Sequence, residues 1–440
     1  MEVQPMALVI AAACTVLGGC DSDSDGNSGS GGSGSGGGSV SGLLSGETLP
    51  LANNGADTVR GQQPTVSNCT VSQGSETAAA AGTCPPSPVK RIALFVDSTS
   101  GTLMSCRYDP STAALALLGW HEASAGPGTA AITLDTSASR AFTVAWDPVT
   151  ATGTLTSFNI GPGGLVTAIN SQQLSQEPLA LALDQAGNTV YVLEQSAGST
   201  PTTLTAFPIK LSTGRIGAAG AQLDMKTEHS ALMYRSPNSD FVYIVDPLAG
   251  TVVPYNIGAN VTTSRPMVAH AQFATGRGPI AMAITPNGQF GYVLNSVDTT
   301  VSVYTLAGGT AATVGPVATI PPPPGGKAQN LSSIVIDPSG QYLYVYDNAN
   351  HIIQSFAINQ PTGALTALAT PFVKITALID SRFPSLGVAG TRSASVLYLS
   401  GGSIISTWTI NPSTGVLTAG KPATVVLNAA ANISASAFGP

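Results

Sequence analysis

The chain has 440 residues, of which only 9% are charged, and its formal net charge is −7. It contains no basic run and no cluster of basic and aromatic residues, which argues against nucleic acid as a partner. Glycine and proline are abundant, with 49 and 31 residues, and valine, threonine, alanine, isoleucine and leucine fill the segments between them. This composition is typical of an all-β protein with many short strands and tight turns.

The N-terminus resembles the signal of a bacterial lipoprotein. An apolar run from Met6 to Leu17 is too short to span a membrane and has the length of a signal-peptide core. It ends in Leu17-Gly18-Gly19-Cys20, which resembles the lipobox, whose cysteine is lipidated. One departure is that Glu2 precedes the run, with no Lys or Arg. The resemblance implies that residues 1–19 are a signal peptide. It also implies that a lipid on Cys20 tethers the chain to the cell envelope, at the periplasmic face of the inner membrane or at the outer membrane.

Two polar segments follow the signal. Residues 20–45 are almost entirely Gly, Ser and Asp, a composition typical of a flexible tether. Residues 46–88 are rich in Thr and Ala, and we expect an irregular N-terminal extension. An oxidising envelope permits one disulfide among Cys69, Cys84 and Cys106. Cys69 with Cys84 is the local pairing and Cys84 with Cys106 the alternative. Their spacing is not that of a zinc site, so we expect no metal there.

From residue 89 to the end the chain repeats itself. The stretch from Gly278 to Leu306, GPIAMAITPNGQFGYVLNSVDTTVSVYTL, is the clearest copy and reads as three strands joined by tight turns. The first strand of successive units opens near Gly128, Pro178, Ser230, Pro279, Leu331 and Pro384. A period of roughly 50 residues with several strands per unit predicts a β-propeller.

The two ends of the repeat region are complementary. The first unit begins near Arg91 directly with a second strand and lacks a first strand. The segment from Asn432 to Pro440 looks like a first strand that stops at its turn. We therefore predict that residues 89–440 form a ring of seven four-stranded blades, closed by a C-terminal strand that completes blade 1. Closure of this kind removes an exposed sheet edge.

The repeats have the form P-x-A-x-x-x-[PD]-x-G-x-x-x-Y-V-x-[ND], and the copy from Pro279 to Asn295 has one more residue before its Pro286-Asn287-Gly288 turn. They resemble the YVTN-type and lactonase-like seven-bladed propellers, a family that includes the bacterial 6-phosphogluconolactonases. The resemblance covers the chain from residue 89 onward and implies the propeller fold. It also implies lactone hydrolysis as one candidate activity. The family's enzymes use His, Arg and Glu near one mouth of the tunnel, but the extended motifs around those residues are absent here, so no catalytic role transfers.

Strand alternation brings two sets of residues to one mouth of the central tunnel. The second strands end at Asp97, Asp147, Glu194, Asp246, Asn295, Asp347 and Ser400. The residues just before the first strands are Glu177, Glu228, His229, Arg277, Lys327 and Arg382. One interpretation makes this mouth an active site, with Glu194 or His229 as the base and Arg277 or Arg382 as the oxyanion partner.

The same residues have other interpretations. The candidate ligand-binding residues at this mouth are Asp97, Asp147, Asp246, Asn295, Asp347 and Arg382. An Asp or Asn at a strand end also caps the following turn for purely structural reasons. That interpretation applies with less force to Glu194, because Glu forms such turns poorly.

Two functions remain open. One is an envelope-tethered binding or scaffold module that holds a protein, peptide or glycan at the tunnel mouth. The other is a lactonase acting on a sugar-type lactone. Export and the acidic balance of the mouth argue against a phosphorylated substrate, so the sequence favours the binding module. We expect a monomer without a cofactor, attached to the membrane only through its lipid.

Overall fold

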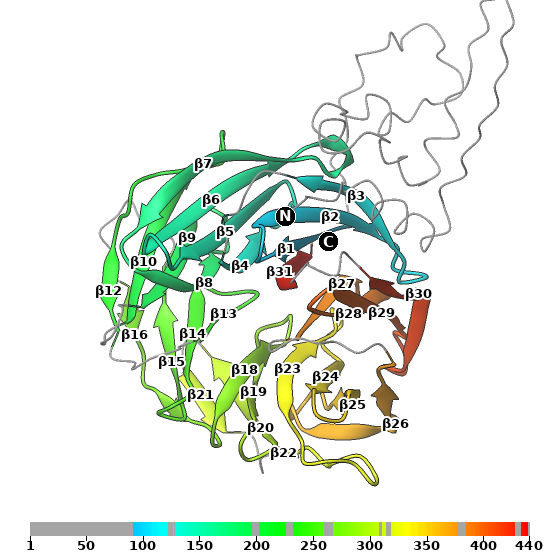
Figure 1. Cartoon of the computed structure of the whole chain (residues 1–440). Coiled ribbons are helices and arrows are strands. Elements are labelled where there is room, and N and C mark those ends of the chain that lie inside the picture. Colours follow the sequence, from blue (N-terminus) through cyan, green and yellow to red (C-terminus); the bar gives the residue numbers. More distant parts are fainter. Residues whose placement is uncertain are drawn as a thin grey trace, which may run out of the picture.

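The computed structural model describes residues 91–121, 126, 128–195, 202–225, 232–258, 267–307, 310–313, 318–376, 384–426 and 433–438. Their strands form seven antiparallel sheets arranged as a ring of blades (Figure 1). The predicted all-β, seven-bladed propeller is therefore confirmed. The predicted signal peptide, tether and N-terminal extension lie outside the described residues. Within the described residues, no helix is long and apolar enough to cross a membrane.

The first three blades come from the N-terminal part of the ring, apart from one strand. Blade 1 contains β1 (Ile92–Asp97), β2 (Thr102–Tyr108), β3 (Leu115–His121) and β31 (Ile433–Phe438). Blade 2 contains β4 (Thr129–Leu134), β5 (Arg140–Asp147), β6 (Thr152–Ile160) and β7 (Val166–Leu174), with the short helix η1 (Pro162–Gly164) between the last two. Blade 3 contains β8 (Glu177–Leu183), β9 (Thr189–Gln195), β10 (Thr202–Lys210), β11 (Arg215–Ile216) and β12 (Gln222–Asp224).

The other four blades follow in chain order. Blade 4 contains β13 (Leu232–Arg235), β14 (Phe241–Asp246), β15 (Thr251–Asn256), β16 (Val268–Ala269) and β17 (Phe273–Ala274). Blade 5 contains β18 (Pro279–Ile284), β19 (Phe290–Asn295), β20 (Thr300–Ala307), β21 (Thr310–Thr313) and β22 (Ala318–Thr319). Blade 6 contains β23 (Leu331–Ile336), β24 (Tyr342–Asp347), β25 (Ile352–Ile358) and β26 (Leu365–Lys374). Blade 7 contains β27 (Ser385–Thr391), β28 (Ala394–Gly401), β29 (Ile404–Ile410) and β30 (Leu417–Val426).

The outermost strand is divided in three blades. In blades 3, 4 and 5 two short strands pair with the same third strand, for example β21 and β22 with β20. Each blade keeps four strand positions, because the two short strands together occupy the outermost one.

The second strand of each blade is the most buried. β14, β19 and β24 are buried along their whole length, because neighbouring blades cover both of their faces. Continuous runs of aromatic and β-branched residues suit that environment. Tyrosines on these strands also bridge blades: the hydroxyls of Tyr191, Tyr292 and Tyr344 donate to backbone carbonyls of Ile257, Gly363 and Gly415 in the next blade.

The core is distributed around the ring. Among the described residues, seven clusters of buried hydrophobic side chains lie one at each interface between neighbouring blades. The predicted closing strand takes part in two of them, since Ile433 belongs to the cluster between blades 7 and 1 and Ala437 to the cluster between blades 1 and 2. β31 pairs antiparallel with β1, with Leu94 opposite Ala437. The predicted closure is confirmed.

The innermost strands are β31, β4, β8, β13, β18, β23 and β27. We call the face of the ring where they begin the leading face, and the face where they end the trailing face. Each second strand runs antiparallel to its inner strand, so it ends at the leading face. Pro178 is paired with Glu194, Pro279 with Asn295 and Leu331 with Asp347. The structure thus confirms that the strand ends and the starts of the inner strands share one face.

Candidate functional site

The aspartates of the leading face cap their own hairpin turns. In each of four blades one carboxylate oxygen accepts the backbone N–H of the residue two positions later, at 2.9–3.1 Å. The four acceptors are Asp97, Asp147, Asp246 and Asp347. The pKa of Asp147 is lowered mainly by the hydrogen bond from the Thr150 hydroxyl. Turn capping therefore accounts for the position of these side chains without a ligand.

Glu194 is tied to the loop that enters its inner strand. It is only 1% exposed. Its Oε2 accepts the backbone N–H groups of Ser175 and Gln176, both at 3.1 Å, and the Ser175 hydroxyl at 3.2 Å. Three donors on one oxygen satisfy most of the hydrogen-bonding demand of a buried carboxylate. The contacts of Glu194 thus fix the approach of β8 to the leading face.

Asn295 replaces the aspartate in blade 5. It is fully buried, and its Nδ2 donates to the hydroxyls of Thr300 and Ser302 at 3.1 and 2.9 Å. Its Oδ1 is buried without a hydrogen-bond partner. The buried amide is therefore bonded to the start of the third strand.

Arg277 and Lys327 are the two basic residues predicted at this face that the structure describes. The side chain of Arg277 is exposed, and its backbone N–H donates to Asp298 at 2.6 Å. The backbone N–H of Lys327 donates to Asn350 at 2.7 Å. His229, Glu228 and Arg382 lie outside the described residues. Among the residues that the structure describes, no group of three or more His, Cys, Asp or Glu side chains could hold a metal ion.

Cys106 is a free thiol in the core of blade 1, so the alternative pairing with Cys84 is not formed. Burial raises the pKa of this thiol to about 12. It is therefore protonated and unreactive at neutral pH. Cys20, Cys69 and Cys84 lie outside the described residues.

The trailing face is built from one turn that recurs in five blades. The residue after each inner strand donates its backbone N–H to the carbonyl five positions later. These bonds join Asp135 to Arg140, Asp184 to Thr189, Ser236 to Phe241, Thr285 to Phe290 and Asp337 to Tyr342. Because this hydrogen bond recurs, the last residues of these five inner strands occupy equivalent positions in their blades. Four of those last residues are aliphatic, and the fifth is an arginine: Leu134, Leu183, Arg235, Ile284 and Ile336.

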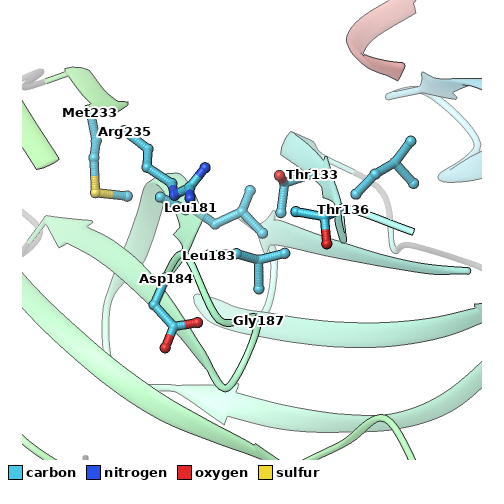
Figure 2. Close-up of a pocket in the computed structure, with 10 residues that line it drawn as sticks. Thr133, Thr136, Leu181, Leu183, Asp184, Gly187, Met233 and Arg235 are labelled. Atoms are coloured by element: carbon cyan, nitrogen blue, oxygen red, sulfur yellow. The ribbon is translucent and has the colours of Figure 1, made fainter. Parts of the chain in front are cut away.

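Arg235 lies beside a cavity of about 190 Å³ between β4, β8 and β13 (Figure 2). Its Nε is buried without a hydrogen-bond partner. Burial lowers the pKa of the guanidinium, and the negative charges of Asp184 and Asp240 oppose that shift. The cavity is thus bordered by a partly buried guanidinium with an unused Nε donor, which is an arrangement suited to binding negative charge.

Asp184 lines the same cavity and is 5% exposed. Its Oδ1 accepts the backbone N–H groups of Asn188 and Thr189 at 2.7 and 3.1 Å. Burial is the main cause that raises the pKa of this carboxyl group, and the neighbouring Asp240 raises it further. A carboxylate with a raised pKa is a stronger base than an exposed one.

A second, larger cavity lies on the other side of β13. It has a volume of about 430 Å³ and is lined by residues of β13, β18, β23 and β27. None of the lining residues is charged. Asp184 and Arg235 are therefore the charged residues that distinguish the smaller cavity.

Arg235 was not predicted from the sequence as a site residue. The signal is readable once the repeats are aligned on their turns. Arg235-Ser236-Pro237-Asn238 corresponds to Ile284-Thr285-Pro286-Asn287 in blade 5 and to Ile336-Asp337-Pro338-Ser339 in blade 6. A charge at a position that is otherwise aliphatic is the feature that could have indicated this site.

Comparison with known proteins points to one family. The family described as "Lactonase, 7-bladed beta-propeller" matches residues 91–376. A protein of Pectobacterium carotovorum named 6-phosphogluconolactonase is 27% identical over 213 residues, which cover 48% of this chain and 62% of that protein. A protein of the same name from Sodalis glossinidius is 29% identical over 246 residues, or 54% of this chain and 71% of that one.

Solved structures agree with the fold. The periplasmic gluconolactonase PpgL of Pseudomonas aeruginosa superposes with a TM-score of 0.64 at 17% sequence identity. The superposition covers 79% of this chain and 99% of that protein. At this identity the likeness concerns the fold alone.

Proposed function

Because the chain belongs to the family of seven-bladed propeller lactonases, we propose that it hydrolyses a lactone of the sugar type. The relatives named 6-phosphogluconolactonase support this chemistry. The proposal replaces the binding module that the sequence favoured. The aspartates that such a module would use are occupied as turn caps at the leading face.

The observation that carries the proposal is Arg235 in its cavity. When water attacks a lactone, negative charge develops on the carbonyl oxygen. A guanidinium held in a water-poor site stabilises that charge without reorganising during the reaction. Removal of one such donor lowers kcat by roughly 10²–10³ in well-studied enzymes. The buried, unpartnered Nε of Arg235 is a donor of this kind.

Asp184 completes the chemistry as the general base. Asp184 is one of the residues that line the same cavity, and its second carboxylate oxygen is the atom that we propose takes a proton from the attacking water. The proton then passes to the ring oxygen as the acyl C–O bond breaks, which leaves a hydroxy acid that loses its own proton to solvent. The backbone hydrogen bonds to Oδ1 hold the carboxylate in place during these steps.

A panel of lactones assayed with the purified chain tests the proposal. We expect hydrolysis by the wild-type protein and a loss of roughly 10²–10³ in kcat for Arg235→Leu. Leucine occurs at the equivalent positions of blades 2 and 3, so the variant keeps the local packing of the repeat. Arg215→Leu, on an exposed residue of blade 3, is the matched control and keeps full activity. Absence of turnover with every lactone would contradict the proposal.

The same assay separates the two faces of the ring. Full activity in Arg235→Leu together with loss of activity in Glu194→Gln, His229→Ala or Arg277→Leu would move the reaction to the leading face. Those three residues are the catalytic candidates from the sequence.

We also propose that the enzyme works at the cell envelope, anchored through Cys20. The support is the lipobox-like Leu17-Gly18-Gly19-Cys20. Labelling with radioactive palmitate tests the anchor, and Cys20→Ala abolishes the label if the proposal is correct.

A further inference from the structure

Arg235 is exceptional among the residues that line the axis of the ring. The seven inner strands carry two charged side chains in all, Glu177 and Arg235. Glu177 begins β8 and lies at the leading face, whereas Arg235 ends β13 and lies at the trailing face. The cation at the trailing end therefore has no counterpart of opposite charge on the inner strands around it.

The cavity presents polar groups opposite the guanidinium. Figure 2 shows the side chain of Arg235 extending from β13 towards the side of the cavity where Thr133 and Thr136 lie. Leu181 and Leu183 form the wall between them. A ligand in this space would meet a cation at one end, hydroxyl groups at the other and aliphatic carbon between. The volume of about 190 Å³ lies below the roughly 300 Å³ at which pockets for drug-sized ligands begin, so the ligand is small.

The surrounding charges limit the ligand to one negative charge. Asp184 and Asp240 both act on Arg235 electrostatically, so the guanidinium is the single cation facing two carboxylates. With both carboxylates ionised, these three groups carry one net negative charge, and a bound monoanion adds only one more. A phosphate group adds up to two charges at neutral pH and would be repelled by the two carboxylates in a poorly solvated site.

We propose that the Arg235 cavity is a binding site for the carboxylate of a small, unphosphorylated hydroxy acid, with the acid's hydroxyl groups directed to Thr133 and Thr136. Hydrolysis adds one water across the acyl C–O bond of a lactone and yields exactly one carboxylate and one alcohol. The choice of a hydroxy acid rests on the proposed function, whereas the anion site follows from the cavity itself. The relatives named for a phosphorylated lactone therefore differ from this chain in the ligand that they accept.

Isothermal titration calorimetry of the full chain with gluconate tests the site without turnover. We expect one gluconate per chain and an affinity reduced roughly 10- to 100-fold in Arg235→Leu, the range expected for loss of a charge-assisted hydrogen bond. Arg235→Lys keeps the charge and retains part of the affinity. Arg215→Leu binds as the wild type does. We also expect 6-phosphogluconate and inorganic phosphate to bind at least tenfold more weakly than gluconate.

The outcomes separate this inference from the proposed function. Absence of gluconate binding, or equal binding by Arg235→Leu and the wild type, overturns the site. Equal affinity for gluconate and 6-phosphogluconate overturns the discrimination against phosphate. Arg235-dependent binding of gluconate without hydrolysis of any lactone supports the site and overturns the proposed function. Hydrolysis of a lactone without Arg235-dependent binding of gluconate supports the proposed function and overturns the site.

Discussion

The two faces of the ring use polar residues in opposite ways. At the leading face an aspartate recurs at the end of the second strand in four blades, and each copy is satisfied by its own turn. At the trailing face the arginine occurs once among five equivalent positions, and its Nε has no partner. The four repeated aspartates thus serve their turns, whereas the single arginine keeps an unused donor beside a cavity.

Singularity alone is not sufficient evidence. Glu194 is also singular, because the other blades do not place a glutamate at that position. It is nevertheless satisfied by the Ser175–Gln176 loop and shielded from solvent. The combination that marks Arg235 is a break in the repeat, an unused donor and an adjacent cavity.

Both faces belong to one closed ring, and opening that ring should have the largest effect. Deleting residues 433–440 removes β31 and its contribution to two interblade clusters. It also leaves the inner edge of β1 unpaired. We expect a loss of about 5 kcal/mol or more in the free energy of unfolding, measured by urea denaturation. A synthetic peptide of residues 432–440 should restore part of the loss. A truncated protein with an unchanged transition would show that the ring does not depend on this strand.

The propeller could be predicted because the same pattern of strands and turns recurs from blade to blade. Strand ends such as Asp246 and Asn295 and turns such as Pro286-Asn287-Gly288 recur at a fixed period. The missing first strand of blade 1 has one complementary segment, at the C-terminus. The site could not be predicted in the same way, because the residues that dominate the pattern are those that build turns. Whether a carboxylate is free or satisfied depends on backbone N–H groups whose positions a sequence does not show, as with Ser175 and Gln176 around Glu194.

A smaller effect would sharpen the contrast between satisfied and unsatisfied residues. Asp246 is 4% exposed and accepts the N–H groups of Leu248 and Ala249. Asp246→Ala leaves these donors without their acceptor and should lower the free energy of unfolding by roughly 1–2 kcal/mol. Lactone hydrolysis should be unaffected. Arg235→Leu should show the opposite pattern, with hydrolysis lost and stability kept or raised by about 1 kcal/mol, because it removes a buried unpartnered group.

Urea denaturation and the lactone assay on both variants measure the contrast. Asp246→Asn is the matched control at the leading face, because its Oδ1 can accept the same two N–H groups. If Asp246→Ala lost activity while remaining as stable as the wild type, the leading face would have a functional role that turn capping does not explain.

The smallest expected effect concerns the pH dependence of stability at the trailing face. Burial raises the pKa of Asp184 in the folded protein, so the folded state favours the neutral carboxyl group. The associated stability is fully present below the unfolded pKa of about 3.8 and is lost as the pH rises through the folded value. Asp184→Asn remains neutral and keeps an oxygen for the N–H groups of Asn188 and Thr189. The variant should therefore be more stable than the wild type at neutral pH, and this advantage should shrink as the pH falls towards 4.

Asp337→Asn provides the matched comparison, because Asp337 caps the equivalent turn of blade 6 through the N–H groups of Gln341 and Tyr342. It does not line the cavity beside Arg235. Thermal unfolding of both variants between pH 4 and pH 8 measures the difference, and the lactone assay shows whether only Asp184→Asn loses activity. Equal pH profiles in the two variants would mean that the surroundings of Asp184 do not disfavour its charged form. The turn of blade 3 would then be no more than another copy of the repeat.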